Sequence, residues 1–585
     1  MAEKVVSPGV FTNEIDQSFL PAAVGEIGAA VIGPTAKGPA MVPTVVTSYS
    51  EFQQKFGDTF KSGSKYYSYL TSVTAQNYLK HSGKMTVVRI MSGSYSYASS
   101  SVFKSGSTTV ASFKVNTHGD GAIENSSGST ATGYGTNQVL ESGSKDNLRW
   151  ETTSVNETKG TFTLLIRRGN DTIKRKQVLE TWNNLSLDPN SNNYISKIIG
   201  NQKATIRGTG TDAYIEYSGS YPNKSKYVWV SDVEDTVDYL NENGVRSDEA
   251  YTGSLPAQEE GQNSGSFFGG SDGDVAHPQN FYDNIAQQTQ GFNIGASWTG
   301  GSEFYQTSLD LLSNQDEYDV NLIMMPGIAQ NLSNHSQIVS KAFDVCEDRG
   351  DCFVIADPTG PGEAQSTAVT SAEAYDSNYG AMYYPWVQTP DLQLGRNVWV
   401  PPSAVLPGIY AFNDKVAHPW FAPAGLNRGG IDTAIQAERK LTHNNRDTLY
   451  EAGINPIATF PGQGVTVWGQ KTLQKKASAL DRVNVRRLMI KLKKFIASSS
   501  RFLVFEQNNS KTRNRFLNIV NPFLEQVQSN SGLNAFKVVM DETNNTPDTI
   551  DRNILFGQIF VQPTRTAEFI VLDFTVQPTG ATFPE

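Results

Sequence analysis

The chain has 585 residues, and its 58 acidic and 48 basic side chains give it a formal net charge of −10. This length is typical of about four domains, and the negative charge argues against a protein that coats nucleic acid along its whole surface. Only 18% of the residues are charged, with Ser, Thr, Asn and Gly in their place. This composition excludes a coiled coil or an acidic disordered tail and favours strands and loops.

The beginning of the chain has an α/β pattern. Residues 1–20 contain few apolar side chains among turn formers, so we expect this end to fray or to pair with another chain. The apolar run at 28–33 predicts a buried strand. Residues 48–57, with a Ser cap and a closing Gly, predict a short helix. A second helix is expected within 66–83 and a strand within 84–91.

A mostly β insertion is predicted over residues 93–225. Its first part is dense in Ser, Gly and Thr, but Tyr, Phe and Val recur between them, which favours short strands joined by long loops. Residues 161–180 contain two strand-like runs around Gly169-Asn170-Asp171, and this pattern predicts a hairpin. A helix is expected near residues 191–200.

Residues 226–374 alternate between helical and strongly apolar segments. Helices are predicted at 304–314 and 334–350, and buried strands at 319–327 and 351–358. Continuous apolar strands separated by helices are typical of a parallel sheet that helices cover on both faces.

The last third is predicted to contain helices at 438–450, 481–497 and 513–530, followed by strands at 553–563 and 567–578. In the final strand apolar side chains alternate with polar ones, which is the period of a half-buried strand. The apolar positions of this strand are Ile570, Leu572, Phe574 and Val576.

The cysteine content and the hydropathy argue against several further classes of protein. Cys346 and Cys352 are the two cysteines, too few for a disulfide framework and wrongly spaced for a redox or zinc pair, so we predict buried thiols. No apolar run reaches the roughly 18 residues that a membrane helix needs. The first residues lack the apolar region of a secretory signal. We therefore expect no membrane insertion.

Two motifs resemble catalytic or cofactor signatures, and neither has the expected flanks. Gly269–Gly273 matches G-x-S-x-G around Ser271, with His277 nearby, which raises a cryptic serine hydrolase as an alternative. Loop-like residues flank this motif, however, and favour a Gly-rich loop. Residues 208–213 match G-x-G-x-x-A but precede a strand, so we predict a hairpin turn. We predict no catalytic residue, cofactor or metal site.

One stretch of the chain is strongly basic. Residues 471–515 contain thirteen Lys or Arg and two acids. Three interpretations remain open: a solvated helix face, a nucleic-acid contact, or a docking face for an acidic protein. Few aromatic residues lie among these cations, which argues against nucleic acid. The cations on the predicted helix are Arg482, Arg486, Arg487, Lys491, Lys493 and Lys494.

Several long motifs, in order along the chain, resemble the contractile sheath proteins of bacteriophage tails. The N-terminal motifs are SPGVFTNEID and AAVIGPTAKGP followed by SYSEFQQKFG. The C-terminal motifs are FAPAGLNRGGI, LYEAGINPI, DRVNVRRL and TNNTPDTIDRNILFGQIFVQPTR. The resemblance touches nearly the whole chain and is weakest over 92–145 and 250–275.

The element pattern and the resemblance together imply a multidomain α+β and α/β fold. We expect an inner α/β core from residues 23–92 plus 375–560, a middle α/β domain over 226–374, and the β-rich outer insertion. Extended arms are expected at residues 1–22 and 561–585.

The resemblance implies a structural protein and not an enzyme. Such subunits stack as hexameric rings around a tail tube and contract to drive the tube through the host envelope for genome delivery. The implied partners are further copies of the chain, the tube, the baseplate and the tail terminator, without direct nucleic-acid contact. The implied location is the virion tail, after assembly in the bacterial cytoplasm. The sheath of a tailocin or another contractile injection system is the alternative.

The resemblance also assigns roles to two groups of residues. The basic helix with the six cations named above is expected to face the tube. The arms are expected to add strands to neighbouring subunits. The arm contacts implied in this way are Val5, Val6, Val10, Phe11, Ile570, Leu572, Phe574 and Val576.

Overall fold

The computed structural model describes residues 28–62, 65–91, 93–126, 143–172, 174–259, 262–273, 288–289, 292–293, 301–391 and 395–570. These residues form two compact units. The large unit contains residues 28–491 together with 564–570, and the small unit contains residues 492–563. Within the described part of the chain, no helix is both long enough and apolar enough to cross a bilayer.

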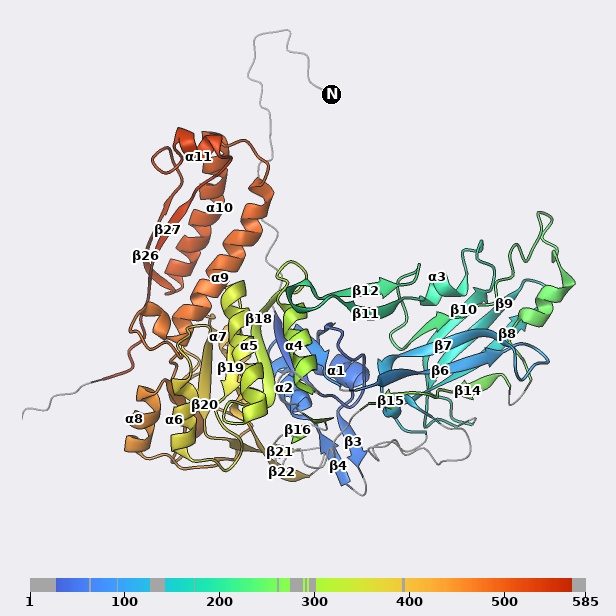
Figure 1. Ribbon diagram of the computed structural model, residues 1–585, viewed down its shortest axis with the longest axis horizontal. Helices are drawn as coiled ribbons and strands as arrows, with labels where there is room; N and C mark the ends of the chain where they lie inside the picture. The colour runs from blue at the N-terminus through green and yellow to red at the C-terminus, as the bar shows by residue number, and fades with distance from the viewer. Residues whose placement is uncertain are drawn as a thin grey trace, which may run out of the picture. The chain divides into compact units, whose positions relative to one another are not determined.

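An eight-stranded sheet is the centre of the large unit (Figure 1). Neighbouring strands from β5 to β24 run parallel, and the two outermost strands pair antiparallel. The order is β2 (Thr44–Val46), β5 (Met85–Arg89), β1 (Gly28–Gly33), β18 (Val320–Ala329), β19 (Phe353–Asp357), β20 (Gly380–Tyr384), β24 (Ile454–Phe460) and β25 (Gly464–Val467).

Apolar side chains cover both faces of this sheet, as predicted. Alternate residues of β1 point to opposite sides, so Val31 belongs to one core and Ile32 to the other. The first core includes residues of α2 (Leu70–Leu79) and α7 (Pro402–Val416). The second includes residues of α4 (Gly301–Leu312), α5 (Ser333–Arg349), α6 (Gln365–Glu373) and α8 (His443–Glu451).

The sheet joins two segments that we predicted as separate domains. β1 lies in the predicted inner core and pairs with β18, with Ala30 opposite Ile323. The predicted border at residue 374 also falls between β19 and β20, which pair in parallel. The division into an inner core of 23–92 plus 375–560 and a middle domain of 226–374 is therefore wrong. Hydrogen bonding between distant strands leaves no mark in local periodicity.

The inserted β region extends to residue 273 and not only to 225. Two four-stranded sheets, β10-β9-β8-β14 and β13-β7-β6-β15, pack against each other through one apolar core. Three strands of this region, β13, β14 and β15, lie beyond the predicted end at residue 225. They pair with β7, β8 and β6, respectively. The elements are β6 (Tyr95–Phe103), β7 (Ala111–Asp120), β8 (Leu148–Asn156), β9 (Thr161–Arg168), β10 (Val178–Ser186), α3 (Ile195–Ile199), β13 (Val228–Ser231), β14 (Ser264–Ser266) and β15 (Ser271–Asp272).

Several local predictions are confirmed. β9 and β10 form the predicted hairpin, and α1 (Tyr49–Phe56) has Ser48 as its N-cap. Residues 208–213 turn the hairpin between β11 (Lys203–Arg207) and β12 (Tyr214–Ser218), where Gly208 and Gly210 have φ of 74° and 60°. The helix expected within 66–83 begins only at Leu70, because Lys65–Ser68 forms β4, which pairs with β3 (Thr59–Ser62).

Smaller elements complete the large unit. A three-stranded sheet joins β22, β21 and β23, and a two-stranded pair joins β16 and β17. Their bounds are β16 (Gln288–Thr289), β17 (Phe292–Asn293), β21 (Val387–Asp391), β22 (Arg396–Val400) and β23 (Gln436–Ala437).

The small unit is a helical pair with a two-stranded ribbon. Helix α9 (Val483–Ser500) begins in the large unit and continues into the small unit. The rings of Phe495 on α9 and Phe523 on α10 stack with centroids 3.7 Å apart. The unit also contains α10 (Ser510–Ser529), β26 (Leu533–Val539), α11 (Pro547–Asp551) and β27 (Gln558–Pro563). Residues 564–570 are not a strand, and the rest of the strand predicted at 567–578 lies outside the described residues.

Candidate functional site

The G-x-S-x-G motif does not form a nucleophile elbow in the described residues. Ser271 is the first residue of the two-residue strand β15 and lies opposite Ser96 of β6. Its Oγ accepts a hydrogen bond from the backbone N–H of Gly273 at 3.3 Å. A nucleophile elbow instead places serine between a buried strand and a helix. His277 lies outside the described residues.

The two cysteines form no reactive centre in the part of the chain that the structure describes. Cys346 and Cys352 are free, buried thiols, with their Sγ atoms 2.9 Å apart. Burial raises the pKa of Cys346, which keeps it protonated and unreactive. Among the described residues, no three His, Cys, Asp or Glu side chains converge as metal ligands would.

The structure buries two of the six cations predicted to face the tube. Arg486 and Arg487 on α9 are only 3% and 4% exposed. Arg487 pairs with Asp414 at 2.5 Å and lies over the ring of Tyr410. Burial disfavours its charge, but Asp414 outweighs burial and raises the pKa of Arg487.

Arg486 has a different environment. Its guanidinium lies 4.0 Å from the ring centre of Tyr379 and donates from Nη1 to Oδ1 of Asn378. Burial lowers its pKa. Both arginines therefore serve the interior of the large unit and are not exposed positions for tube docking. The sequence pattern did not predict this burial, because arginine can bury its aliphatic stem and stack its guanidinium group on an aromatic ring inside a fold.

The exposed charge on α9 comes mainly from Lys491 and Lys493. Lys494 is half-buried. Arg482 is also half-buried and pairs with Glu568 of the C-terminal segment. The basic surface of this helix is thus smaller than the sequence predicts.

The predicted arm contacts fall almost entirely outside the described residues. This applies to Val5, Val6, Val10, Phe11, Leu572, Phe574 and Val576. Ile570 is described, and its side chain is 80% exposed. Its neighbour Phe569 is 78% exposed, so this segment of the large unit presents two large apolar side chains to solvent.

The β26–β27 ribbon is a second exposed feature. In the described residues its two strands pair only with each other. Alternate side chains of the ribbon, including Phe536 and Val561, are half-buried, whereas Phe560 on the opposite face is 56% exposed. An isolated two-stranded ribbon is marginally stable, and its open edges can pair with further strands.

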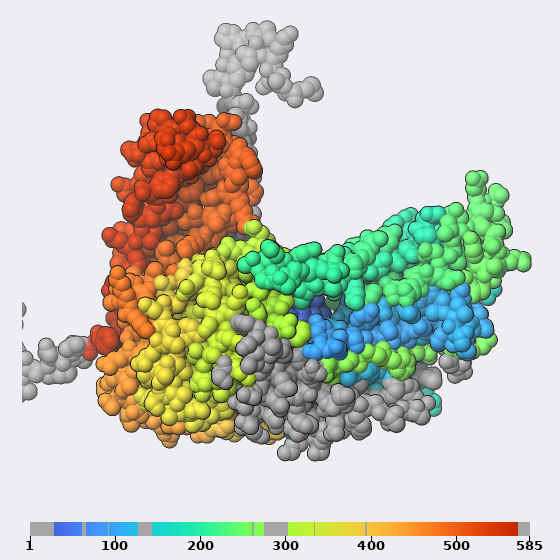
Figure 2. Space-filling model, in the orientation of Figure 1, coloured from blue at the N-terminus to red at the C-terminus, as the bar shows by residue number. Residues whose placement is uncertain are grey.

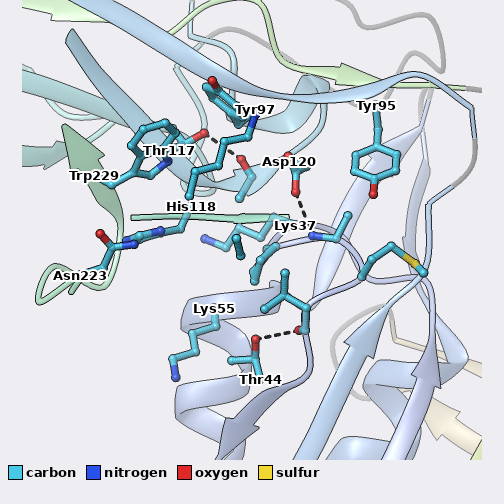
Figure 3. Close-up of a pocket in the computed structure, with 18 of the residues that line it drawn as sticks. Lys37, Thr44, Lys55, Tyr95, Tyr97, Thr117, His118, Asp120, Asn223 and Trp229 are labelled. Carbon is cyan, nitrogen blue, oxygen red and sulfur yellow. Dashed lines mark hydrogen bonds between the residues drawn. The ribbon is translucent and has the colours of Figure 1, made fainter. Parts of the chain in front are cut away.

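A cavity of about 930 Å³ lies in the large unit between the loop after β1, the β6–β7–β13 sheet, the β11–β12 ribbon and α4. Figure 2 shows the surface hollowed beneath this ribbon. In Figure 3, Lys37 lies among the side chains that line the cavity, and Asp120 accepts a hydrogen bond from the backbone N–H of Ala40 at 2.8 Å. Trp229 meets Tyr97 edge to face at 5.4 Å.

A buried carboxyl group forms part of the cavity wall. Glu124 is only 5% exposed. Burial raises its pKa to about 7, against the opposing effect of Lys37 and Arg89. Burial also raises the pKa of Asp120. The sequence motifs did not indicate this pair, because the cavity forms only when residues 117–124 meet the loop after β1, the β11–β12 ribbon and α4 in the fold.

Two known protein domains match consecutive parts of this chain. Residues 305–473 match the phage tail sheath protein central domain, and residues 475–577 match the phage tail sheath C-terminal domain. The predicted resemblance to contractile tail sheath proteins is therefore confirmed over residues 305–577.

Individual sheath proteins match parts of the same chain. The tail sheath protein of Vibrio phage KVP40 is 34% identical over 324 residues, which cover 50% of this chain and 47% of the relative. The tail sheath protein of Enterobacteria phage T4 is 32% identical over 338 residues, which cover 54% of this chain and 51% of the relative. The chain thus spans about half the length of these curated relatives.

A solved structure shares the fold over a longer range. The crystal structure of the sheath tail protein from Listeria innocua has a TM-score of 0.50 and 11% sequence identity to this chain. The alignment covers 89% of this chain and 90% of that structure. The mixed α/β, multidomain fold class is therefore shared with a sheath protein.

Proposed function

We propose that this chain is the structural subunit of a contractile bacteriophage tail sheath. The observation that carries the proposal is the consecutive match to both sheath domains over residues 305–577. Subunits form stacked hexameric rings around the tail tube, and the stack shortens to drive the tube through the host envelope for genome delivery. The chain acts mechanically and not as an enzyme, within the virion tail after assembly in the bacterial cytoplasm.

Neighbouring subunits hold one another by exchanging strands. The open edges of the β26–β27 ribbon accept strands from residues 1–22 and from the part of the 561–585 arm that follows β27 in other copies. Exposed Ile570 and Phe569 support this role, because an apolar pair in solvent gains stability when a partner covers it. The inserted β region over 93–273 faces outward, and the baseplate and tail terminator cap the ends of the stack.

Electron microscopy of the purified chain tests this proposal. The full-length protein is expected to form rings or tubes, and a chain without residues 1–20 is expected to remain as single particles. Thermal unfolding serves as the control, because an unchanged midpoint shows that the shortened chain is folded. Single particles from both chains, at concentrations at which sheaths polymerise, would contradict the proposal.

The tube is held in part by the exposed lysines of α9. Reversing Lys491 and Lys493 together (Lys491→Glu and Lys493→Glu) is expected to slow sheath assembly on purified tubes about tenfold at low salt, because attraction to an acidic tube is lost. The rate is measured by electron microscopy of samples taken over time, and the difference should shrink at high salt.

The matched control reverses Lys159 and Lys174, two exposed lysines of the inserted β region. This variant carries the same change in net charge and should assemble at the rate of the unaltered chain. Equal slowing in both variants would show that net charge matters and that the α9 lysines have no special role.

A sheath from a tailocin or another contractile injection device would use the same mechanics. Neighbouring genes for a capsid and a portal would distinguish the phage tail from these devices.

A further inference from the structure

After β27 the chain returns to the large unit, where one carboxylate holds it. Residues 564–570 belong to the large unit, although they directly follow the last strand of the small unit. Figure 1 shows this segment passing close to α8. Glu568 makes the contacts that hold the segment to α8 and to the beginning of α9.

Three side chains from three parts of the sequence converge on this carboxylate. Tyr450 of α8 donates its hydroxyl to Oε2 of Glu568 at 2.7 Å. Oε1 accepts from Nε of Arg482 at 2.7 Å and from Nε2 of Gln470 at 3.1 Å. Nε2 of Gln470 also lies 2.7 Å from Oγ1 of Thr566, so a second residue of the segment is tied to the same group.

The electrostatics of this cluster favour an ionised Glu568. Burial alone would raise its pKa, but hydrogen bonds from Arg482 and Tyr450 outweigh burial and keep the pKa below its usual range. The cation of Lys471 lies 4.3 Å from the ring centre of Tyr450 and adds positive charge nearby. A half-buried, charge-assisted network of this kind is stronger than an exposed ion pair.

The solvent exposure of the side chains rises immediately after Glu568. Glu568 is half-buried, whereas Phe569 and Ile570 are 78% and 80% exposed. The segment is thus held at Thr566 and Glu568, and the two residues after Glu568 present large apolar side chains to solvent.

We infer that Glu568 anchors the C-terminal segment so that Phe569 and Ile570 dock on a second copy of this chain. This inference rests on the proposed function, in which C-terminal strands join neighbouring subunits. A force on the residues beyond Ile570 then passes through Glu568 to Tyr450 and Arg482 of the large unit. The β26–β27 ribbon is spared that force, because the anchor lies between it and the docked residues.

Limited trypsin digestion of the purified full-length chain tests the anchor. Arg565 is exposed and lies three positions before Glu568. Replacing Glu568 by Gln removes the charge but keeps the shape, and cleavage after Arg565 should become about tenfold faster or more. Tyr450→Phe removes a single hydrogen bond and should give a smaller increase. Mass spectrometry identifies the cleavage site.

The control is Glu525→Gln, which alters an exposed glutamate on α10. It should leave the cleavage rate unchanged. Cleavage of the Glu568→Gln chain at the unaltered rate would overturn the anchor, whatever the chain assembles into.

A second measurement separates the anchor from the proposed function. Assembled sheaths of the Glu568→Gln chain are expected to dissociate at a lower urea concentration than sheaths of the unaltered chain. If the segment is released but the sheaths resist urea equally, docking through this anchor is wrong. If the unaltered chain forms no sheath while Glu568→Gln still releases the segment, the proposed function fails and docking fails with it, whereas the intramolecular anchor stands.

Discussion

Replacing Arg167 by Ala is expected to lower the stability of the inserted β region by about 3–5 kcal/mol, because it leaves the fully buried carboxylate of Asp171 without its cation. Glu151 loses one of two cations and keeps Lys176 at 2.6 Å. Arg167 donates from Nε and Nη2 to both oxygens of Asp171, at 2.7 and 2.8 Å. Its Nη1 donates to Glu151 at 2.8 Å. The side chain of Asp171 is 0% exposed and that of Glu151 is 7% exposed, so water cannot replace the lost partner.

Hydrogen exchange over β8 and β9 measures this loss locally, which matters because a chain with several units need not unfold in one step. The matched control is Arg207→Ala. Arg207 also pairs with a glutamate, Glu216 at 2.6 Å, but the two side chains are 59% and 44% exposed. An exposed pair contributes less than about 1 kcal/mol. Similar losses in both variants would show that burial of the Arg167 cluster has no special effect.

The second large effect is expected at Glu124, where the Glu124→Gln chain should be more stable than the unaltered chain above pH 7. Burial raises the pKa of Glu124 from 4.5 to about 7. The folded chain therefore holds this proton more tightly than the unfolded chain. Its stability should be greatest below pH 4.5, fall as the pH rises to about 7, and then stay level. Glutamine needs no proton, so this dependence disappears.

The advantage of Glu124→Gln should reach about 3 kcal/mol above pH 7 and be small at pH 5. Thermal unfolding at pH 5 and pH 8 measures the difference. Glu303→Gln is the control, because Glu303 lines the same cavity but is exposed. An equal gain at both pH values would mean that Glu124 is not held protonated. The charged groups around Glu124 are Lys37, Arg89, Asp120 and Asp146.

Local signals in the sequence determined many elements of the fold. The apolar runs within 319–327 and 351–358 predicted β18 and β19 and their burial on both faces. Ser48 and Gly57 bounded α1 because a side-chain cap and a glycine with positive φ act within one turn of a helix. The resemblance to sheath proteins also came from the sequence, because several long motifs can be compared in their order along the chain without knowledge of how they pack.

The tertiary structure alone decided which strands pair and which charged groups are exposed. β18 joins β1 across almost 300 residues, and β14 and β15 complete sheets whose first strands begin at Leu148 and Tyr95. Periodicity reports only whether a strand is buried, not which strand lies beside it. For this reason the predicted domain borders failed although many of the predicted elements are present.

The basic helix shows the same limit at the level of single residues. The sequence determined that the region of α9 carries a row of cations. In the fold, Arg487 pairs with Asp414, which lies 73 residues earlier in the chain, and Arg482 pairs with Glu568, which lies 86 residues later. A long cationic side chain can be solvated or buried beside a partner with almost the same local sequence. Only the folded chain, by placing those partners, decides which cations remain exposed for another protein.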